Sequence, residues 1–338
     1  MKERIEKQIL SVLVSGKKSI YEVIYHQDSS LNEFLEIIKN LQNKKILKID
    51  NGYLELTNKG KKVARNLKFI EAKCKYCNGT GYSIPKFFRK VLKTYSKICE
   101  KRPEAIEKYD QGFIDPEGVI KRVEFIYECG DIYGKIFVLG DDDLFSIACA
   151  LTKFPKLIFV AEIDERIVNF INKIAKKYRL NIKAVVYDAQ KNLPNSLRKS
   201  FDVFVTDPVE TLDGLKLFFS RCVSSLKGIG CSGYFGITQS EASRKKWYEI
   251  QKMIFEMGFV ITDIKKKFNI YPCTEKNFFR FQEKLPIFNL LKTKTDFNWY
   301  TSCLYRIEAV KEPKPLISWN MKINEKMYKD EESLATPY

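Results

Sequence analysis

The sequence predicts a doubly wound α/β domain with a Rossmann-like, methyltransferase-type sheet, preceded by a smaller winged-helix-like α+β unit. Three observations in the larger unit support this fold class. Short apolar runs that suit buried parallel strands recur between residues 136 and 206, and segments with helical periodicity separate them. The first run ends at a glycine, Gly140, and leads into a helix expected over 144–151. The runs end in acidic residues, where ligands bind in such folds.

Three aspartates follow the glycine at the end of the first predicted strand, which covers 136–139. They are Asp141, Asp142 and Asp143. Nucleotide-binding sheets usually carry a glycine-rich turn here, so that backbone N–H groups can approach an anion. Three carboxylates in the same place repel anions and attract cations. The turn therefore predicts a cationic ligand.

Acidic residues also end the later strands. They are Glu162, Asp164, Asp188, Asp207 and Glu210, after strands expected over 157–161, 184–187 and 201–206. An acid about twenty residues after the glycine turn typically binds ribose hydroxyls, which suits Glu162 and Asp164. Asp188 is placed to meet an adenine amino group. Any one of these acids could instead cap a helix, but together they favour nucleoside binding.

The charge pattern discriminates between two sulfonium donors. S-adenosylmethionine carries a sulfonium, an ammonium and a carboxylate, and its decarboxylated form keeps both cations and loses the anion. Placing the carboxylate against the triple-aspartate turn costs several kcal/mol through like-charge repulsion. We therefore hypothesise aminopropyl transfer rather than methyl transfer.

At these residues the chain resembles the branched-chain polyamine synthases of archaeal and bacterial thermophiles, the N(4)-bis(aminopropyl)spermidine synthases. The shared motifs are Gly140-Asp141-Asp142-Asp143, Glu162-Ile163-Asp164 and Asp207-Pro208-x-Glu210-Thr211. The first motif is the more specific, because linear spermidine synthases share the second. Val209 departs from the pattern, since a second proline is expected there. The resemblance covers most of the chain, including the N-terminal unit.

The resemblance implies an aminopropyltransferase that uses decarboxylated S-adenosylmethionine as co-substrate and spermidine as acceptor. The central secondary amine of spermidine would attack the aminopropyl carbon, methylthioadenosine would leave, and the product would be a tertiary amine and then a quaternary ammonium. Because polyamine nitrogens are protonated near neutral pH, a carboxylate must first take the proton. Asp142 is the first candidate for this catalytic role and Asp207 the second. A covalent aminopropyl-carboxylate intermediate is an open alternative.

The other candidate site residues divide into two groups. Those expected to bind the co-substrate are Gly140, Asp141, Glu162, Asp164, Asp188 and Gln111, and those expected to bind the amine are Asp143, Glu210 and Tyr234. Gln111 belongs to a polar Asp-Gln-Gly stretch that could also be a simple turn. The ring of Tyr234 could line an alkylamine channel or belong to the core.

We expect four segments along the chain. They are a winged-helix-like unit over 1–70, a Cys-x-x-Cys knuckle and connector over 71–118, the catalytic domain over 119–310 and a flexible acidic tail over 311–338. The small unit should contain three helices and a hairpin with an Asn-Gly turn over 46–56. This unit could bind nucleic acid, or it could be a dimerisation or substrate-lid module. Its third helix has little basic charge, which favours the dimerisation or lid interpretation.

The catalytic domain and the tail contain further predicted elements. We expect helices over 87–99, 118–128, 211–226 and 241–257, the last with Ser240 as N-cap, and closing strands over 233–238, 260–266 and 299–307. The tail should be poorly ordered without a partner. Its Asp330-Glu331-Glu332 run could fold over a polycation or remain solvated.

Cys74 and Cys77 form the knuckle. A structural zinc needs about four ligands, and the sequence contains no second Cys-x-x-Cys. Zinc, an intersubunit disulfide and plain thiols are therefore all open. The remaining cysteines are scattered and are expected to be reduced core residues.

The overall charge is strongly positive, with 59 Lys and Arg against 42 Asp and Glu and a net charge of +17. This balance suits either a nucleic-acid-binding protein or a hyperthermophile surface. With the family resemblance, we expect a cytoplasmic homodimer that binds neither nucleic acid nor membrane, since no apolar run could span a bilayer and no signal peptide opens the chain.

The strongest rival interpretation is an RNA or DNA methyltransferase on the same sheet, with Asp207-Pro208 near the target amine. Against it, Glu210 stands where methyltransferases of the Asp-Pro-Pro-aromatic type place a stacking ring. A nucleotide-sensing regulator without turnover is a third interpretation, and it predicts salt-dependent DNA binding.

Overall fold

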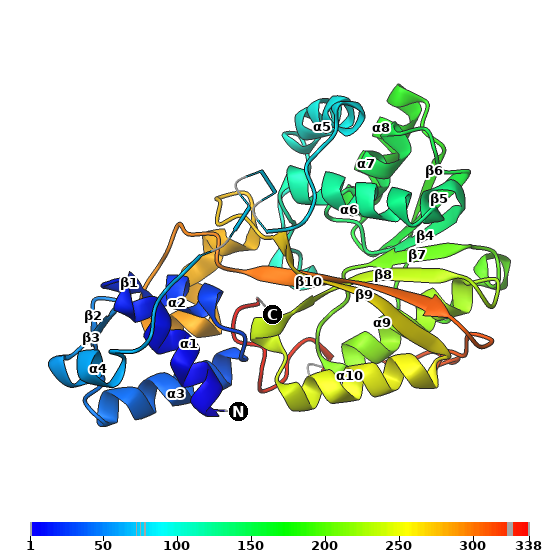
Figure 1. Ribbon diagram of the computed structural model, residues 1–338. Helices are drawn as coiled ribbons and strands as arrows, with labels where there is room; N and C mark the ends of the chain where they lie inside the picture. The colour runs from blue at the N-terminus through cyan, green and yellow to red at the C-terminus, as the bar shows by residue number, and fades with distance from the viewer. Residues whose placement is uncertain (1, 72, 75, 78, 323–326, 337–338) are drawn as a thin grey trace.

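A seven-stranded sheet runs through the larger lobe of the described chain (Figure 1). The computed structural model describes residues 2–71, 73–74, 76–77, 79–322 and 327–336. The strand order is β6-β5-β4-β7-β8-β10-β9, in which β10 is antiparallel to both neighbours and the pairs from β6 to β8 are parallel. This arrangement confirms the predicted methyltransferase-type fold. The strands are β4 Lys135–Leu139, β5 Leu157–Glu162, β6 Ile182–Val186, β7 Val203–Thr206, β8 Ser232–Thr238, β9 Phe259–Ile270 and β10 Thr301–Ala309.

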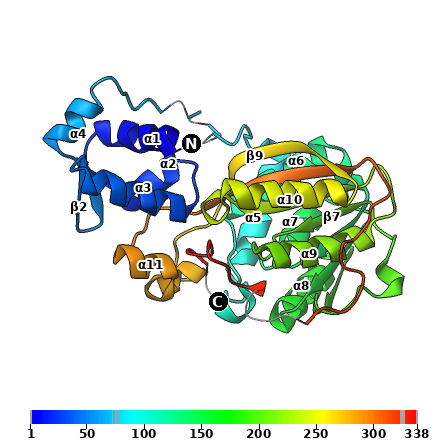
Figure 2. The ribbon, with the colours of Figure 1, turned by 90° about the horizontal axis from the view of Figure 1, so that it is seen from below.

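Helices cover both faces of the sheet, so the central strands are apolar on both sides. Along β4, Ile136 and Val138 pack into one core layer, and Phe137 and Leu139 pack into the other. Each fully buried side chain of this kind stabilises the fold by about 1.5–3 kcal/mol. One layer is covered by α6 Pro116–Glu128, α7 Phe145–Leu151 and α8 Glu165–Tyr178, and the other by α9 Leu212–Ser225 and α10 Arg244–Glu256 (Figures 1 and 2).

The turn after β4 has an unusual backbone. Gly140 adopts φ 74°, a left-handed conformation that glycine reaches without steric cost. Leu144 is also left-handed, with φ 59°, and α7 begins at the next residue. The three aspartates between these two residues therefore lie in a tight loop at the carboxyl edge of the sheet, where the ends of β5 and β7 flank it.

The smaller lobe contains the three helices and the hairpin of the predicted winged-helix-like unit. Serine N-caps close capping boxes at the second and third helices. Asn51 and Gly52 both have positive φ, as the Asn-Gly hairpin turn requires. The elements are α1 Lys2–Val14, β1 Lys18–Ser19, α2 Ile20–His26, α3 Leu31–Asn43, β2 Leu47–Asp50, β3 Tyr53–Leu56 and α4 Asn58–Val63.

The connecting segments add elements of their own. Helix α5 covers Lys86–Cys99, close to the expected range, and α11 Pro286–Leu291 belongs to an unpredicted insertion between β9 and β10. This insertion contacts the smaller lobe, where the hydroxyl of Tyr21 donates to the carbonyl of Thr293 at 2.7 Å. Short 3₁₀ turns occur at η1 Glu107–Tyr109, η2 Asp131–Tyr133, η3 Asn195–Leu197, η4 Gln239–Glu241 and η5 Phe278–Lys284.

The start of α10 differs from the prediction. Ser243, not Ser240, caps the helix by accepting a hydrogen bond from the N–H of Lys246. The 3₁₀ turn η4, Gln239–Glu241, lies just before it and directs Glu241 into the protein interior at 1% exposure. The sequence contains two serines at suitable positions, and tertiary burial of Glu241 selects the second.

The described part of the C-terminal tail is not the poorly ordered terminus that we expected. Arg221 on α9 donates to the carbonyls of Ile317 and Trp319 at 3.0 and 2.8 Å. Further along, Met327 and Ala335 are 2% and 0% exposed. Figure 2 shows the tail in red, ending between the two lobes. Residues 323–326 and 337–338 lie outside the described residues.

No helix in the described ranges has the length and apolar character needed to cross a bilayer.

Candidate active site

Two adjoining cavities open at the carboxyl edge of the sheet. They share part of their lining, namely Asp110, Asp142, Asp207, Pro208 and Tyr328. The first cavity extends over the ends of β5 and β6, and the second extends toward β8 and the tail. The shared residues form a junction at which groups bound in the two cavities would meet.

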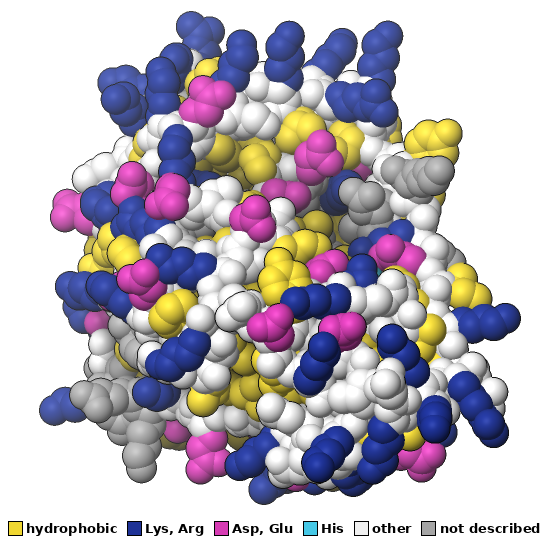
Figure 3. Space-filling view, turned by 90° about the vertical axis from the view of Figure 1, so that its left-hand side faces the viewer, with side chains coloured by type: hydrophobic (Ala, Val, Ile, Leu, Met, Phe, Trp, Pro, Cys, Tyr) yellow, Lys and Arg dark blue, Asp and Glu magenta, His cyan; other side chains and the backbone are white. Residues whose placement is uncertain are grey.

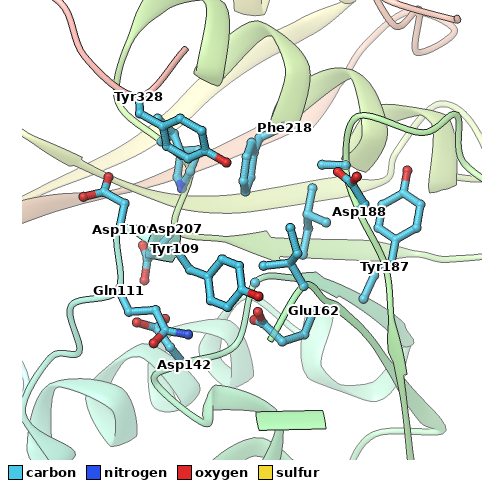
Figure 4. A pocket seen from close by; sticks show the side chains of 17 residues that line it. Tyr109, Asp110, Gln111, Asp142, Glu162, Tyr187, Asp188, Asp207, Phe218 and Tyr328 are labelled. Atoms are coloured by element: carbon cyan, nitrogen blue, oxygen red, sulfur yellow. The ribbon is translucent and has the colours of Figure 1, made fainter. Parts of the chain in front are cut away.

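The first cavity has the character of a nucleoside pocket (Figure 4). Glu162, at the end of β5, and Asp188, after β6, supply carboxylates, and Phe218 on α9 supplies an aromatic face. Glu162 accepts hydrogen bonds from the backbone N–H groups of Asp141 and Asp164 at 2.7 and 2.9 Å, which fixes its carboxylate. Burial raises the pKa of Glu162.

Two predicted site residues stand behind this cavity and are not part of its lining. Asp141 accepts hydrogen bonds from the backbone N–H and the hydroxyl of Ser146, at 3.2 and 2.5 Å, and so organises the start of α7. Asp164 caps α8 and accepts a hydrogen bond at 2.9 Å from Nε2 of Gln111, which does line the cavity. Both aspartates therefore support lining groups instead of contacting the cavity.

At the junction, Asp142 occupies the middle of the triple-aspartate turn. Its Oδ2 accepts a hydrogen bond at 3.0 Å from the backbone N–H of Gly112, in the connector before α6. Burial, with further repulsion from the negative charges of Glu162 and Asp207, raises the pKa of Asp142 to about 7. A carboxyl with such a pKa can exchange a proton near neutral pH.

Asp110 reaches the junction from the opposite side of the cleft from Tyr187 and Asp188 (Figure 4). It adopts a left-handed backbone with φ 51°. Its Oδ1 is buried and has no hydrogen-bond partner among the described residues. Burial, followed by the nearby charges of Glu210 and Asp142, raises the pKa of Asp110 well above its usual value. A buried acceptor without a partner indicates a place for a ligand donor.

The second cavity is lined by carboxylates and tyrosines. Glu210 accepts the backbone N–H of Thr238 on both oxygens, at 3.0 and 2.9 Å, and burial raises its pKa to about 7. Glu241 accepts the N–H groups of Leu334 and Ala335, each at 2.9 Å, and thereby holds the tail over the cavity. The lining includes Gly112, Gly236, Tyr271, Tyr300, Tyr328, Ser333 and Thr336.

The cleft therefore reverses the field of the molecular surface. Figure 3 shows Lys and Arg side chains projecting around the outline of one face of the protein. Among the described residues that line the two cavities there is no Lys, Arg or His, and seven are Asp or Glu. Such a cleft favours cationic ligands and disfavours a free carboxylate or phosphate.

The structure brings most of the predicted site residues together. Those that line a cavity are Gly140, Asp142, Glu162, Asp188, Gln111, Asp207 and Glu210. Asp143 lies just beneath the junction, where its Oδ1 accepts the N–H of Ile114 at 2.7 Å. It is therefore a supporting residue in this structure and not a lining one.

The structure does not place Tyr234 at either cavity. Its side chain is 0% exposed, its ring packs on Phe125 of α6, and its hydroxyl donates to Asp131 at 2.5 Å. On the same face of β8, Gly236 does reach the second cavity. Tyr234 is two residues further from the carboxyl edge, about 7 Å along the strand, and therefore lies in the core.

Sequence reasoning did not identify several lining residues. They are Tyr109, Tyr187, Phe218, Glu241, Tyr271, Tyr300 and Tyr328. For Asp110, a simple polar turn was favoured slightly more than it was for Gln111. Glu241 and Tyr328 give no local signal, because only the path of the tail brings them to the cleft. The Asp-Gln-Gly stretch did carry a signal for Asp110, since its neighbour Gln111 was selected.

The zinc interpretation of Cys74 and Cys77 is not supported. Across the described ranges, no group of three or more Cys, His, Asp or Glu side chains could hold a metal ion. Both thiols are free, and hydrogen bonds from the backbone of Gly81 and Gly79 lower the pKa of Cys77. The other seven cysteines are free thiols as well.

The sheet order and the acid-lined cleft define a Rossmann-like, methyltransferase-type domain with an acidic cleft at the carboxyl edge of its sheet. Residues 90–335 match the family model described as the branched-chain polyamine synthase A C-terminal domain. The chain belongs to the branched-chain polyamine synthase family.

Relatives in this family match the chain over nearly its whole length. It is 36% identical to an N(4)-bis(aminopropyl)spermidine synthase of Methanocaldococcus jannaschii, over 98% of this chain and 94% of that protein. It is 34% identical to the Thermococcus kodakarensis synthase, over 99% of this chain and 95% of that protein. A crystal structure of the Thermus thermophilus branched-chain polyamine synthase, in complex with N4-aminopropylspermidine and 5'-methylthioadenosine, is similar with TM-score 0.86 and 31% identity, over 99% and 93% of the chains.

Proposed function

We propose that this chain transfers aminopropyl groups from decarboxylated S-adenosylmethionine to the central secondary amine of spermidine, with release of methylthioadenosine. The observation that carries the proposal is the junction of Asp110, Asp142 and Asp207 between a nucleoside-like cavity and a carboxylate-lined one. The ligands of the Thermus thermophilus relative, a branched polyamine and methylthioadenosine, are the products of such a transfer.

In this proposal the first cavity binds the donor. Glu162 is placed for the ribose hydroxyls, Asp188 for the adenine amino group and Phe218 for the face of the base. The aminopropyl ammonium would lie at the junction, near Asp110 and Asp142. The carboxylate of S-adenosylmethionine would meet only acids there, because the described lining residues include no cation. This argues against the methyltransferase alternative.

The second cavity would bind the acceptor. A polyamine alternates ammonium groups with short alkyl segments, and the cavity is lined by both carboxylates and tyrosine rings. Glu210 and Glu241 lie beyond the junction and would hold ammonium groups, while Tyr271 and Tyr300 would contact the alkyl chain. The central nitrogen would then be fixed close to the reacting carbon.

We propose direct displacement, with Asp142 as general base. The central ammonium of spermidine gives one proton to Asp142, and its lone pair attacks the aminopropyl carbon. The new N–C bond forms as the C–S bond breaks, and methylthioadenosine leaves as a neutral thioether. The sulfonium charge is thereby transferred to the new tertiary ammonium. A second cycle removes the proton of that ammonium and produces a quaternary ammonium.

The direct test is turnover of decarboxylated S-adenosylmethionine and spermidine, with the products identified by mass spectrometry. Formation of N4-aminopropylspermidine and then of the bis-aminopropyl product, with one methylthioadenosine released for each aminopropyl group transferred, would support the proposal. A linear product such as spermine would show that the terminal amine is the acceptor. Methylated RNA or DNA from S-adenosylmethionine would instead support the rival function.

We also propose that the protein is a homodimer in a reducing compartment, the cytoplasm. Free thiols at all nine cysteines support the compartment. Phe87, Tyr127 and Tyr133 are exposed and pack around Phe154, which supplies an aromatic surface suited to a second copy. Light scattering of the purified chain tests the oligomeric state.

A further inference from the structure

A buried arginine lies directly behind the junction. Arg122 on α6 is 2% exposed. Its Nη1 is 2.9 Å from Oδ2 of Asp207, and its Nη2 is 3.4 Å from Oδ1 of the same residue. Nη1 is also 3.5 Å from Oδ2 of Asp143. The guanidinium therefore contacts both oxygens of a lining carboxylate and one oxygen of a supporting carboxylate.

The strand beside Asp207 limits its carboxylate to this orientation. A Cβ atom added at Gly236 on β8 would be 2.5 Å from Oδ1 of Asp207. The carboxylate thus fills the space above a glycine, while Arg122 holds it from the α6 side. Pro208 follows directly and fixes the backbone on its C-terminal side. A side chain packed from two sides has little freedom to turn away from an acceptor.

The arginine also changes the charge balance of the cleft. Several ionisable groups face Asp207 and the arginine, from each element packed against them. They are Asp142 and Asp143 from the turn after β4, Glu210 from the loop after β7 and Tyr271 after β9. Two further cations lower the pKa of neighbouring carboxyls, namely Arg102 that of Asp142 and Lys246 that of Glu210. Arg122 is the cation that contacts Asp207 and Asp143 directly, so its removal would take away the positive charge paired with these two carboxylates.

We propose that Arg122 is a positioning residue that fixes Asp207 in the geometry needed to hold the acceptor amine. This inference rests on the proposed function, because it assigns Asp207 to the acceptor side of the junction. Arg122 does not line either cavity and touches no reactant in this arrangement. Substitution of Arg122 should therefore change the kinetics with the acceptor and leave the donor affinity unchanged.

The test compares Arg122→Lys and Arg122→Met. Lysine keeps the charge but not the two-point contact, because its ammonium is a single donor centre. We expect Arg122→Met to lower kcat/KM for spermidine about 100-fold or more. The acid limb of the pH profile of kcat/KM should also move to higher pH, because the carboxylates lose a compensating charge. Arg122→Lys should restore the pH profile and recover about a tenth of the wild-type kcat/KM. The donor dissociation constant should change less than about threefold in either variant.

Arg306 provides a matched control. It is also a largely buried arginine in an ion pair, with Nη2 3.2 Å from Oδ2 of Asp131, but it lines neither cavity. Arg306→Met should lower thermal stability and leave kcat, the acceptor KM and the pH profile unchanged.

Three outcomes would decide the inference. If Arg122→Met lost stability but kept wild-type kcat/KM and pH profile, as expected for Arg306→Met, Arg122 would be merely structural and the inference would be overturned. If Arg122→Met failed to fold, Arg122→Lys would carry the test, and wild-type kinetics in that variant would overturn it. Failure of the wild-type protein to use spermidine would instead overturn the proposed function itself.

Discussion

The backbone N–H of Gly112 donates to Oδ2 of Asp142 at 3.0 Å, which ties the connector before α6 to the triple-aspartate turn. The contact leaves Oδ1 of Asp142 for a ligand at the junction of the two cavities. It also brings Asp110, two residues before Gly112, to the same junction. The reacting groups are thus assembled from two segments that are about 30 residues apart in the sequence.

Replacing Asp142 with asparagine should abolish most of the activity. The amide keeps the size of the side chain but accepts no proton from the central ammonium, so kcat should fall by about 10²–10⁴-fold. Steady-state kinetics with spermidine measures this. Asp213→Asn, at an exposed position in the first turn of α9, is the matched control and should leave kcat unchanged. An Asp142→Asn enzyme with wild-type kcat would show that another group takes the proton.

The same carboxyl should reduce the stability of the protein as pH rises. Because the folded-state pKa of Asp142 is about 7, above the usual 3.8, the folded protein binds this proton more tightly than the unfolded chain. Between about pH 4 and pH 7 the stabilising effect of the bound proton is therefore lost. At pH 7.5, Asp142→Asn should be more stable by about 1–2 kcal/mol, and at pH 4 the difference should vanish. Denaturant unfolding at both pH values measures this difference in the free energy of unfolding. A variant that is stabilised equally at pH 4 and pH 7.5 would contradict this explanation.

The tail should contribute to acceptor binding. Glu241 holds Leu334 and Ala335, and Ser333 and Thr336 line only the second cavity. Deletion of residues 327–338 should raise the acceptor KM about tenfold or more, while the donor affinity changes less, although Tyr328 borders both cavities. Glu331→Gln, an exposed change within the intact tail, is the control. An unaltered acceptor KM after deletion would mean that the tail is not part of the site.

Tyr234→Phe should separate a core role from a substrate role. The variant loses the hydrogen bonds of its hydroxyl with Asp131 and Arg306, so the free energy of unfolding should fall by about 1–2 kcal/mol. Both kcat and the acceptor KM should remain within about twofold, because the ring lies outside both cavities. A large rise in KM at wild-type stability would restore Tyr234 to the substrate channel.

Direct displacement predicts that no methylthioadenosine is released before the acceptor binds. A rapid-quench experiment with enzyme and donor alone should therefore show no burst of methylthioadenosine. A burst of about one equivalent per active site would indicate a covalent aminopropyl-carboxylate intermediate instead.

The sequence predicted those parts of the site that depend on local pattern. Strand ends and the acids that follow them are local features, and parallel pairing brings the strand ends to one edge, so Asp142, Glu162 and Asp207 were placed together. The orientation of side chains behind that edge depends on packing. This is why Asp141 and Asp143 support the cleft, although the motif alone made them ligands.

Other parts of the site depend on contacts distant in sequence and could not be predicted. Glu241 enters the cleft because a 3₁₀ turn precedes α10, and Tyr328 enters because Arg221 and Glu241 direct the path of the tail. Tyr234, in contrast, was predicted to bind the amine but lies outside the cleft. Its strand was identified correctly, but its depth in the sheet relative to Gly236 decides that it belongs to the core.

The most direct test of the central claim is calorimetric binding of the two sulfonium donors to the wild-type protein and to Asp142→Asn. The cation-selective cleft predicts that decarboxylated S-adenosylmethionine binds the wild-type protein at least about 100-fold more tightly than S-adenosylmethionine, and that Asp142→Asn narrows this ratio. Equal affinity for the two donors, or tighter binding of S-adenosylmethionine, would contradict the claim and support methyl transfer.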